Sequence, residues 1–427
     1  MMPNAAAAAR CSEMEVRLAD VEFVAARRHL LRHIALEIFC RDGTTFFFAF
    51  ESTEARGRFH REVARAAASA GGIGVDGWST LPSAAQIRAD PALTQRWRER
   101  TLSTFDYIMH LNSAAGRTYN DLTQYPIFPW VVADYASKAF PFDVPRAFRD
   151  LTKPIGALNP QRLARVMERF IAQKAAPLHS VHGAGAGGAP GPNAIAPFMY
   201  GSHYSHPGAV IDFMLRIEPF TALHVLLQGG RFDLADRLFS DVGATWGKCS
   251  GAAGDVREAV PELYYFPALL RNGNALPLGE KQDGVVVDDV ALPSWAHGSP
   301  HSFVRIARAA LESECVSAHV HHWIDLVFGA SQRGVAAERA NNVFFHLTYE
   351  GAVQWGDLGD PRERSAVEAQ ISSFGQCPSQ LFTKPHPARL SLGGALAARF
   401  PRAHDGARRT SRRCVRRSTV ALHSARR

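Results

Sequence analysis

The stretch from Asn112 to Trp130, NSAAGRTYNDLTQYPIFPW, limits most strongly what this chain can fold into. It follows neither the helical nor the strand period, and it is too aromatic for a solvated loop. If its backbone is buried, the peptide groups need hydrogen-bond partners. Polar side chains within the stretch can supply them: Asn112, Arg117, Thr118, Asn120, Asp121 and Gln124. The sequence therefore predicts a core built partly from irregular peptide.

A β-hairpin and one helix are predicted ahead of this stretch. Apolar residues alternate over 34–40, and a second apolar run covers 45–50, with an Asp-Gly turn at 42–43 between them. A helix then begins after Ser52 or Thr53 and ends by Gly71. Because a free-standing barrel needs more strands than these, we expect an incomplete domain.

Helices with clear caps are predicted further along the chain. Each has a capping residue or a terminating glycine beside an apolar stripe. They cover residues 159–171, 299–311, 316–327 and 360–374. The stripe of the first includes Ile171, which we expect to face inward. A glycine-rich insert at 182–193 is expected to be flexible.

The basic charge is concentrated at one end of the chain. The formal net charge is +8, but residues 399–427 hold ten arginines and a single acid. The remaining 38 basic and 39 acidic residues leave the body at −1. A nucleic-acid groove is therefore not expected in the folded part. We expect the tail to be a solvated, disordered end, and the alternative is a basic helix on anionic lipid or RNA.

Cysteine usage and the amino-terminal sequence indicate a reducing compartment. The six cysteines form no CxxC pair, which argues against a zinc cluster and a disulfide framework. The first residues lack a leucine-rich leader core, and no apolar stretch is long enough to span a membrane. We therefore expect a soluble cytosolic protein.

Motifs that imitate catalytic or metal sites fail on their spacing. Residues 243–249 resemble a phosphate loop but are one residue short, so we expect a surface loop. His319 and His322 share a helix face without a further ligand at metal-binding spacing. We expect no catalytic residue, no cofactor and no metal. An enzyme whose groups meet only in space stays open as an alternative.

Ordered blocks of sequence resemble the BEACH domain, the module of neurobeachin and the lysosomal trafficking regulator. Examples are YGSHYS at 200–205, LTYEG at 347–351 and FGQ at 374–376. Further blocks in the same order are 94–97, 112–130, 148–158, 218–221, 227–233, 255–258, 292–296, 310–313, 323–326, 340–344 and 385–387. The hairpin and helix before them resemble the latter part of the pleckstrin-homology-like (PH-like) domain that precedes BEACH in this family.

The resemblance implies an α+β fold and a division of the chain. The expected parts are a partial PH-like domain at 1–72, a linker at 73–93, a mainly α-helical BEACH domain at 94–389 and an arginine-rich disordered tail at 390–427. The BEACH core is expected to contain irregular extended segments. Members of this family usually continue into WD40 repeats, whereas this chain continues into the tail.

The resemblance also implies a function without a reaction. It implies a non-enzymatic scaffold or adaptor in vesicle, lysosome-related or autophagic membrane traffic. Its partners are expected to be trafficking proteins, kinases among them, with peripheral attachment to endomembranes from the cytoplasm. The family's partner surface is a groove between the PH-like unit and BEACH. Candidates for partner binding, or for a purely structural polar role in the core, are Asn112, Arg117, Asn120, Asp121, His203 and Tyr204.

Overall fold

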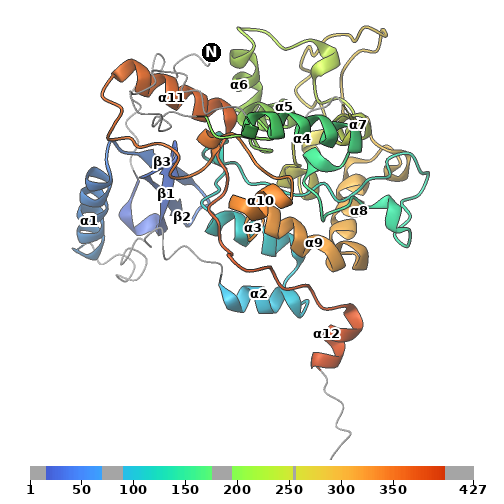
Figure 1. Cartoon of the computed structure of the whole chain (residues 1–427), viewed down its shortest axis with the longest axis horizontal. Helices are drawn as coiled ribbons and strands as arrows, with labels where there is room; N and C mark the ends of the chain where they lie inside the picture. Colours follow the sequence, from blue (N-terminus) through green and yellow to red (C-terminus); the bar gives the residue numbers. More distant parts are fainter. Residues whose placement is uncertain (1–15, 70–89, 176–194, 253–255, 400–427) are drawn as a thin grey trace, which may run out of the picture.

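The structure is a computed structural model that describes residues 16–69, 90–175, 195–252 and 256–399 (Figure 1). Most of the predicted linker, the predicted flexible insert at 182–193 and the tail beyond 399 lie outside these residues. None of the described helices is long and apolar enough to cross a membrane.

A three-stranded antiparallel sheet opens the described fold. Its strands are β1 (Val21–His29), β2 (Arg32–Cys40) and β3 (Thr45–Ala49), in that order across the sheet. The predicted hairpin of β2 and β3 is confirmed. The sequence did not predict β1, because Arg27 and Arg28 interrupt its apolar pattern. In the fold these two arginines are buried and hydrogen-bonded.

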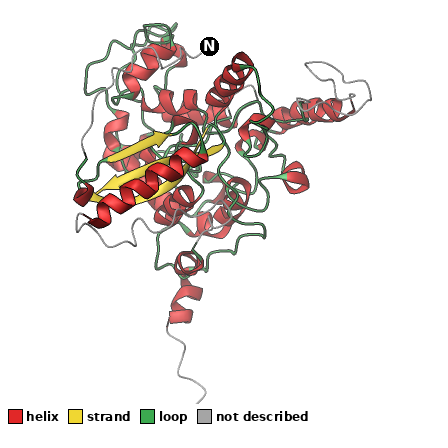
Figure 2. Ribbon diagram, turned by 90° about the vertical axis from the view of Figure 1, so that its left-hand side faces the viewer, coloured by secondary structure: helices red, strands yellow, loops and turns green. Residues whose placement is uncertain are grey.

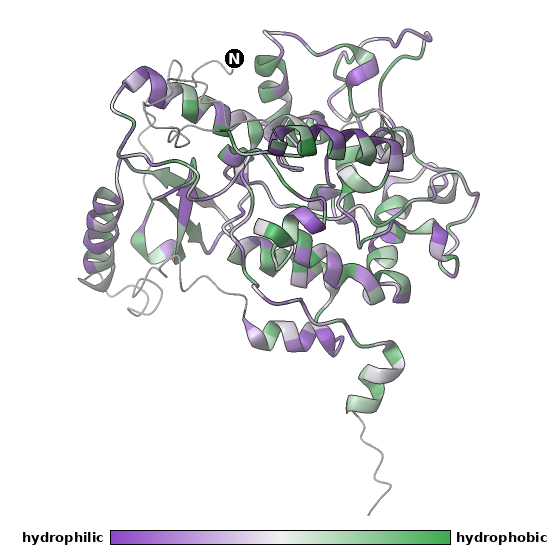
Figure 3. Ribbon diagram, in the orientation of Figure 1, coloured by the Kyte–Doolittle hydropathy of each residue, from purple (hydrophilic) through white to green (hydrophobic). Residues whose placement is uncertain are grey.

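The predicted helix after the hairpin covers one face of the sheet. It is α1 (Thr53–Ser69), which lies in front of the strands in Figure 2. Ser52 accepts a hydrogen bond from the Ala55 amide at 3.1 Å, as a cap does. Phe59 of α1 contacts Phe48 of β3 and Phe50, which directly follows that strand. Much of α1 is hydrophilic (Figure 3), as befits a helix with one face in water.

The second part of the fold is mainly helical. Its elements are α2 (Pro91–Arg98), α3 (Thr104–Ala114), α4 (Pro160–Ala175), α5 (Pro207–Met214), α6 (Phe220–Leu227), α7 (Val242–Ser250), α8 (Pro300–Glu312), α9 (Glu314–Val327), α10 (Gly334–Arg339), α11 (Pro361–Phe374) and α12 (Leu392–Arg399). Together with the sheet they confirm the predicted α+β class.

The predicted helix boundaries follow their caps. Asn159 accepts from the Arg162 amide at 3.0 Å, Ser299 from the Ser302 amide at 3.3 Å and Asp360 from the Arg362 amide at 2.8 Å. One side chain was placed wrongly by the prediction. Ile171 is 58% exposed, because it lies at the edge of the α4 stripe rather than in it.

Two further expectations are corrected by the structure. Residues 243–249 belong to α7 and are not a surface loop, since Asp241 caps the helix and Cys249 is buried in the core. Residues 392–399 form α12 and are not disordered. Ala395 of α12 is buried, and the Leu390 amide donates to the Arg98 carbonyl at 3.1 Å, which ties the segment to the end of α2 (Figure 1).

The stretch from 112 to 130 runs through the core, as predicted, but it is not irregular throughout, because residues 112–114 end α3 and Leu122–Gln124 form a short 3-10 helix. Tyr125, Ile127, Phe128 and Trp130 are all at most 2% exposed. The Trp130 indole N–H donates to the Arg257 carbonyl at 3.1 Å. The aromatic residues of this stretch, apart from the exposed Tyr119, are therefore buried among the helices, and the Phe128 amide, for example, donates to the Ala259 carbonyl.

Candidate functional site

Asn112 makes the two hydrogen bonds to Ile127 that a neighbouring strand would otherwise supply. Its side-chain amide donates to the Ile127 carbonyl at 3.0 Å, and its side-chain oxygen accepts from the Ile127 amide at 2.8 Å. The residue is 1% exposed. Asn112 therefore satisfies both peptide groups of a core residue that no strand pairs.

Arg117 and His203 meet at Ser205. The Arg117 guanidinium donates to the Gln376 carbonyl at 2.6 Å and to Ser205, whose hydroxyl lies 2.9 Å from His203 Nδ1. Burial lowers the pKa of Arg117 to about 9. Burial, and then the Arg117 charge, also keep the pKa of His203 well below its usual value. All three residues are buried, so the serine and histidine do not face solvent.

Tyr204 is held inside the helical part. Its hydroxyl donates to the Asn342 side-chain oxygen at 3.1 Å, and Asn342 in turn donates to the Leu326 carbonyl at 2.8 Å. Burial raises the pKa of Tyr204 well above its usual value. Its ring lies edge-on to Phe344 with centroids 4.6 Å apart. Tyr204 therefore links the core to the segment after α10.

Asp121 organises the chain where it meets the sheet. It accepts from the Thr123 amide at 2.9 Å and from the Gln124 side chain at 2.9 Å, and it lies 3.8 Å from His29 of β1. Burial alone raises the pKa of Asp121, but the nearby His29 and the hydrogen bonds from Thr123 and Gln124 outweigh burial and lower it. Asp121 is therefore a negative group between the two parts of the fold.

Asn120 joins the same stretch directly to two strands. Its amide donates to Glu37 of β2 at 2.7 Å and to the Thr45 hydroxyl of β3 at 2.8 Å. Glu37 is 1% exposed and also accepts from Arg27 at 2.6 Å and from Thr118. Asn120 is the one exposed residue of the six candidates. The sheet is thus covered by α1 on one face and by the 117–124 segment on the other.

The turn between β1 and β2 inserts into the helical part. We call its residues Leu30 and Leu31 the plug. Leu30 and Leu31 have left-handed backbones, with φ of 47° and 63°, and both are buried. They form an apolar cluster with Leu347 and Ile371. The Leu31 amide donates to the Gln376 side chain at 2.8 Å. Left-handed residues other than glycine are uncommon. Contacts with the helical part therefore hold this turn in a conformation that its own sequence does not favour.

Ion pairs surround this plug. Glu350 accepts from Arg28 at 2.9 Å and from His33 at 2.5 Å, and Arg32 donates to Glu368 at 3.0 Å. Burial raises the pKa of Glu350, but the His33 hydrogen bond and the Arg28 charge outweigh it and bring the pKa down to about 2. The sheet and the helical part are therefore fixed together by polar and apolar contacts.

Glu350→Gln should destabilise the protein by about 1–2 kcal/mol at neutral pH, allowing for solvent screening. The pKa of Glu350 is lower in the folded state than its usual 4.5, so its contribution is complete above pH 4.5 and is lost as the pH falls towards 2. Urea unfolding of both proteins between pH 6 and pH 3 should show the difference shrinking with acid. The exposed Glu51→Gln serves as the control, and a constant difference would contradict the assignment.

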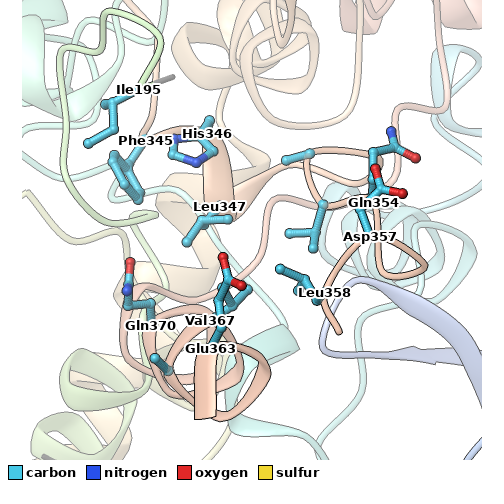
Figure 4. Close-up of a pocket in the computed structure, with 13 residues that line it drawn as sticks. Ile195, Phe345, His346, Leu347, Gln354, Asp357, Leu358, Glu363, Val367 and Gln370 are labelled. Carbon is cyan, nitrogen blue, oxygen red and sulfur yellow. The ribbon is translucent and has the colours of Figure 1, made fainter. Parts of the chain in front are cut away.

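A cavity of about 340 Å³ lies beside the plug (Figure 4). It is bounded by α11, by the segment 345–347 and by the loop 352–358, and Ile195 closes one side. Its floor shares Phe345, Leu347, Val353 and Val367 with the cluster that holds the β1–β2 turn. None of the six candidate residues lines it.

Two exposed tyrosines lie next to Asn120, the residue that bonds to the sheet. Tyr119 and Tyr265 are each 43% exposed, and their hydroxyls lie 3.4 Å apart. Tyr265 also donates to the buried Glu262 at 3.1 Å. Burial and the nearby Glu262 charge raise the pKa of Tyr119 to about 12. We call Tyr119, Asn120 and Tyr265 the tyrosine rim.

The six candidate residues mainly join segments of the fold. Within the described residues, no group of three or more histidine, cysteine, aspartate or glutamate side chains is arranged to hold a metal ion. The candidates Arg117 and His203 are brought together, Asn120 and Asp121 lie at the sheet, and Asn112 and Tyr204 lie apart in the core. These polar groups thus form hydrogen bonds between segments of the protein itself.

The sequence did not predict which residues join the sheet to the helical part, namely Glu37, Glu350 and Gln376. Glu37 lies in an alternating strand, at a position whose neighbours on the same face are apolar, and that was the available signal. Glu350 and Gln376 lie in the quoted LTYEG and FGQ blocks, which marked them without giving them a role. Their partners are more than 300 residues away, and no local pattern predicts such pairs.

Two family models match the chain. One, described as the Beige/BEACH domain, covers residues 95–389. The other, described as the PH domain associated with Beige/BEACH, covers residues 4–64. The resemblance drawn from the sequence blocks is therefore confirmed.

Curated relatives agree with these matches. The BEACH domain-containing protein lvsD of Dictyostelium discoideum is 48% identical over 70% of this chain and 10% of its own length. BEACH domain-containing protein B of Arabidopsis thaliana is 50% identical over 69% of this chain and 11% of its own length. A putative neurobeachin homolog of Caenorhabditis elegans is 39% identical over 92% of this chain and 15% of its own length.

The chain thus spans only 10% to 15% of the length of these relatives. The matches run through the sheet and the helical part alike. Because one family model covers more than half of the sequence, the protein belongs to the Beige/BEACH domain family and carries the PH domain associated with it.

Proposed function

We propose that this protein is a non-enzymatic scaffold that binds protein partners in vesicle, lysosome-related or autophagic membrane traffic. The observation that carries the proposal is the fixed junction between the PH-like sheet and BEACH. Polar contacts of Glu37, Asp121 and Glu350 across the junction hold the two modules in one orientation. A partner that contacts both modules then meets a surface that is already ordered, which lowers the entropy cost of binding.

The tyrosine rim is the proposed contact surface. Tyrosine offers a large, rigid and amphipathic contact at little entropic cost, and it is enriched in protein interfaces. The Tyr119 ring lies edge-on to the buried Tyr125, with centroids 5.3 Å apart, so its position is set before a partner arrives. Asn120 ties the same stretch to the strands. For the other five candidates we propose a structural role that supports this surface.

The enzyme alternative finds less support. An active site gathers polar groups with shifted pKa values in a shared cavity. Here Arg117, His203 and Tyr204 do have shifted pKa values, but burial is the main cause of each shift, and none of these side chains lines the cavity beside α11. The alternative of lipid or RNA binding concerns the arginine tail beyond 399, which lies outside the described residues.

The test is proximity labelling in cells with the full chain fused to a labelling enzyme. We expect trafficking proteins, kinases among them, on the cytoplasmic side of endomembranes. Replacing Tyr119 and Tyr265 by alanine should remove most of these neighbours. Phe142→Ala is the matched control, because Phe142 is also 43% exposed but lies away from the rim in sequence and contacts.

Two results would count against the proposal. One is a set of neighbours no different from that of the free labelling enzyme. The other is a set that survives the rim variant but disappears when Arg412, Arg413, Arg416 and Arg417 are replaced by serine. That second result would favour binding through the tail.

A further inference from the structure

The cavity beside α11 is separate from the tyrosine rim and has its own chemistry. Figure 4 shows side chains from the segment 345–347, from the loop 352–358 and from α11 converging on it. At about 340 Å³ it lies at the lower end of the range for ligand sites, roughly 300–1,000 Å³. It therefore has room for a few side chains rather than for a large cofactor.

The floor of the cavity is apolar. Phe345, Leu347, Val353, Leu358 and Val367 contribute to it. Burying aliphatic groups against such a floor is favourable by about 25 cal/mol per Å² of apolar surface removed from water. The floor therefore selects aliphatic side chains in a ligand.

The charged side chains that line the cavity are both acidic. Asp357 and Glu363 are the charged residues among those that line it, and no lysine or arginine does. The nearby Arg364 instead lies over the Trp355 ring, 5.8 Å from its centroid, and 3.8 Å from Glu368. Because Glu363 is in the first turn of α11, the helix dipole offsets part of its charge. Asp357 is thus the stronger attraction for a cation.

One polar group at the cavity has spare hydrogen-bonding capacity. His346 Nδ1 is buried and has no hydrogen-bond partner in the part of the chain that the structure describes. Burial lowers the pKa of His346, so the ring is neutral at physiological pH. A neutral imidazole nitrogen can donate to or accept from a peptide group, depending on its tautomer.

The cavity is continuous with the junction of the two modules. Leu347 belongs to the apolar cluster that holds the Leu30–Leu31 turn, Phe345, Val353 and Val367 pack against that cluster, and all four line the cavity. A ligand on this floor extends the apolar cluster that holds the sheet. Binding there should therefore favour the docked arrangement of sheet and BEACH.

We propose that this cavity binds an extended segment of a partner protein that carries one or two aliphatic side chains flanked by lysine or arginine. The aliphatic groups enter the apolar floor, the cations face Asp357 and Glu363, and a peptide group bonds to His346. The proposal rests on the proposed function as a protein-binding scaffold, and it assigns a second contact with a defined partner chemistry.

The test uses the full chain and fluorescein-labelled peptides in fluorescence polarisation. The probe is Lys-Lys-Leu-Leu-Lys-Lys, and the comparison peptides replace its leucines by serine or its lysines by glutamate. We expect saturable binding of the probe and at least about tenfold weaker binding of both comparison peptides, a factor that corresponds to 1.4 kcal/mol. Addition of the probe should also raise the melting temperature.

Variants locate the binding. Ala366→Phe narrows the cavity from α11 and should weaken the probe about tenfold, and Asp357→Asn about threefold, by the same relation between affinity and free energy. Asp283→Asn is the matched control, since Asp283 is exposed and outside the cavity. The melting temperature of each variant without peptide checks that it is folded. Unchanged affinity in Ala366→Phe overturns the proposal.

Other occupants give distinct results. Tighter probe binding after replacing Arg412, Arg413, Arg416 and Arg417 by serine would mean that the protein's own tail fills the cavity, and this overturns the proposal. Equal binding of the leucine and serine peptides would mean charge attraction alone, which also overturns it. The Tyr119 and Tyr265 variant should keep full probe binding. Loss of the peptide site and loss of the cellular neighbours are therefore separate failures.

Discussion

Arg149→Met should destabilise the protein by about 3–5 kcal/mol, because it leaves Glu258 charged and unpaired in the core. The two side chains are 0% and 1% exposed. Arg149 donates twice to Glu258, at 2.6 Å and 2.8 Å. Glu258 also accepts from the Trp323 indole at 3.1 Å and from the Trp130 amide at 3.2 Å. Denaturant unfolding followed by circular dichroism measures the loss.

Two controls separate burial from simple loss of an ion pair. The double variant Arg149→Met with Glu258→Leu removes both charges and should recover part of the lost stability. Lys153→Met breaks a pair with Asp150 whose side chains are 54% and 44% exposed, and should cost no more than about 1 kcal/mol. If Arg149→Met and Lys153→Met cost the same, the pair with Glu258 is not buried in solution.

Trp130→Ala should cost about 3–5 kcal/mol, as large core truncations do. The indole is 2% exposed and lies 6.0 Å from the rings of both Phe213 and Trp246. The variant also leaves the Arg257 carbonyl without the indole hydrogen bond. Thermal and urea unfolding should show a less stable protein rather than a folded protein with a missing activity.

Trp355→Ala is the matched control for this truncation. Trp355 is only partly buried, and its ring is contacted by Arg32, 4.5 Å from the centroid. We expect a smaller loss, of roughly 1 kcal/mol, from the cation–π contact. A normal melting curve for Trp130→Ala would mean that the 112–130 stretch is not the interior framework.

Local signals in the sequence predicted local structure well. Asn159, Ser299 and Asp360 marked helix starts, and the Asp-Gly turn marked the β2–β3 hairpin, because caps and turns depend on residues within one turn of the chain. The buried nature of 112–130 was also predictable, since aromatic residues without a period need a place inside a core. These features predicted individual elements, whereas the α+β class was implied by the resemblance to the BEACH family.

The remaining features depend on contacts that local sequence does not contain. Gly243 and Gly247 made α7 resemble a loop, yet tertiary packing of Thr245 and Cys249 keeps it helical. The sequence indicated that polar residues such as Asn120 need partners if they are buried, but it did not predict Glu37 as the partner of Asn120 or Glu350 as the partner of Arg28. Such pairs join distant parts of the chain, and only the fold brings them together.

The plug at Leu30 and Leu31 has a consequence for how the protein is made. Its partners Leu347, Ile371 and Gln376 are synthesised more than 300 residues later. At a ribosomal rate of 5–20 residues per second, the emerging strands wait roughly 15–70 s before their apolar turn can be covered. During that interval we expect the uncovered leucine turn to be open to aggregation, so docking onto BEACH is a late step of folding.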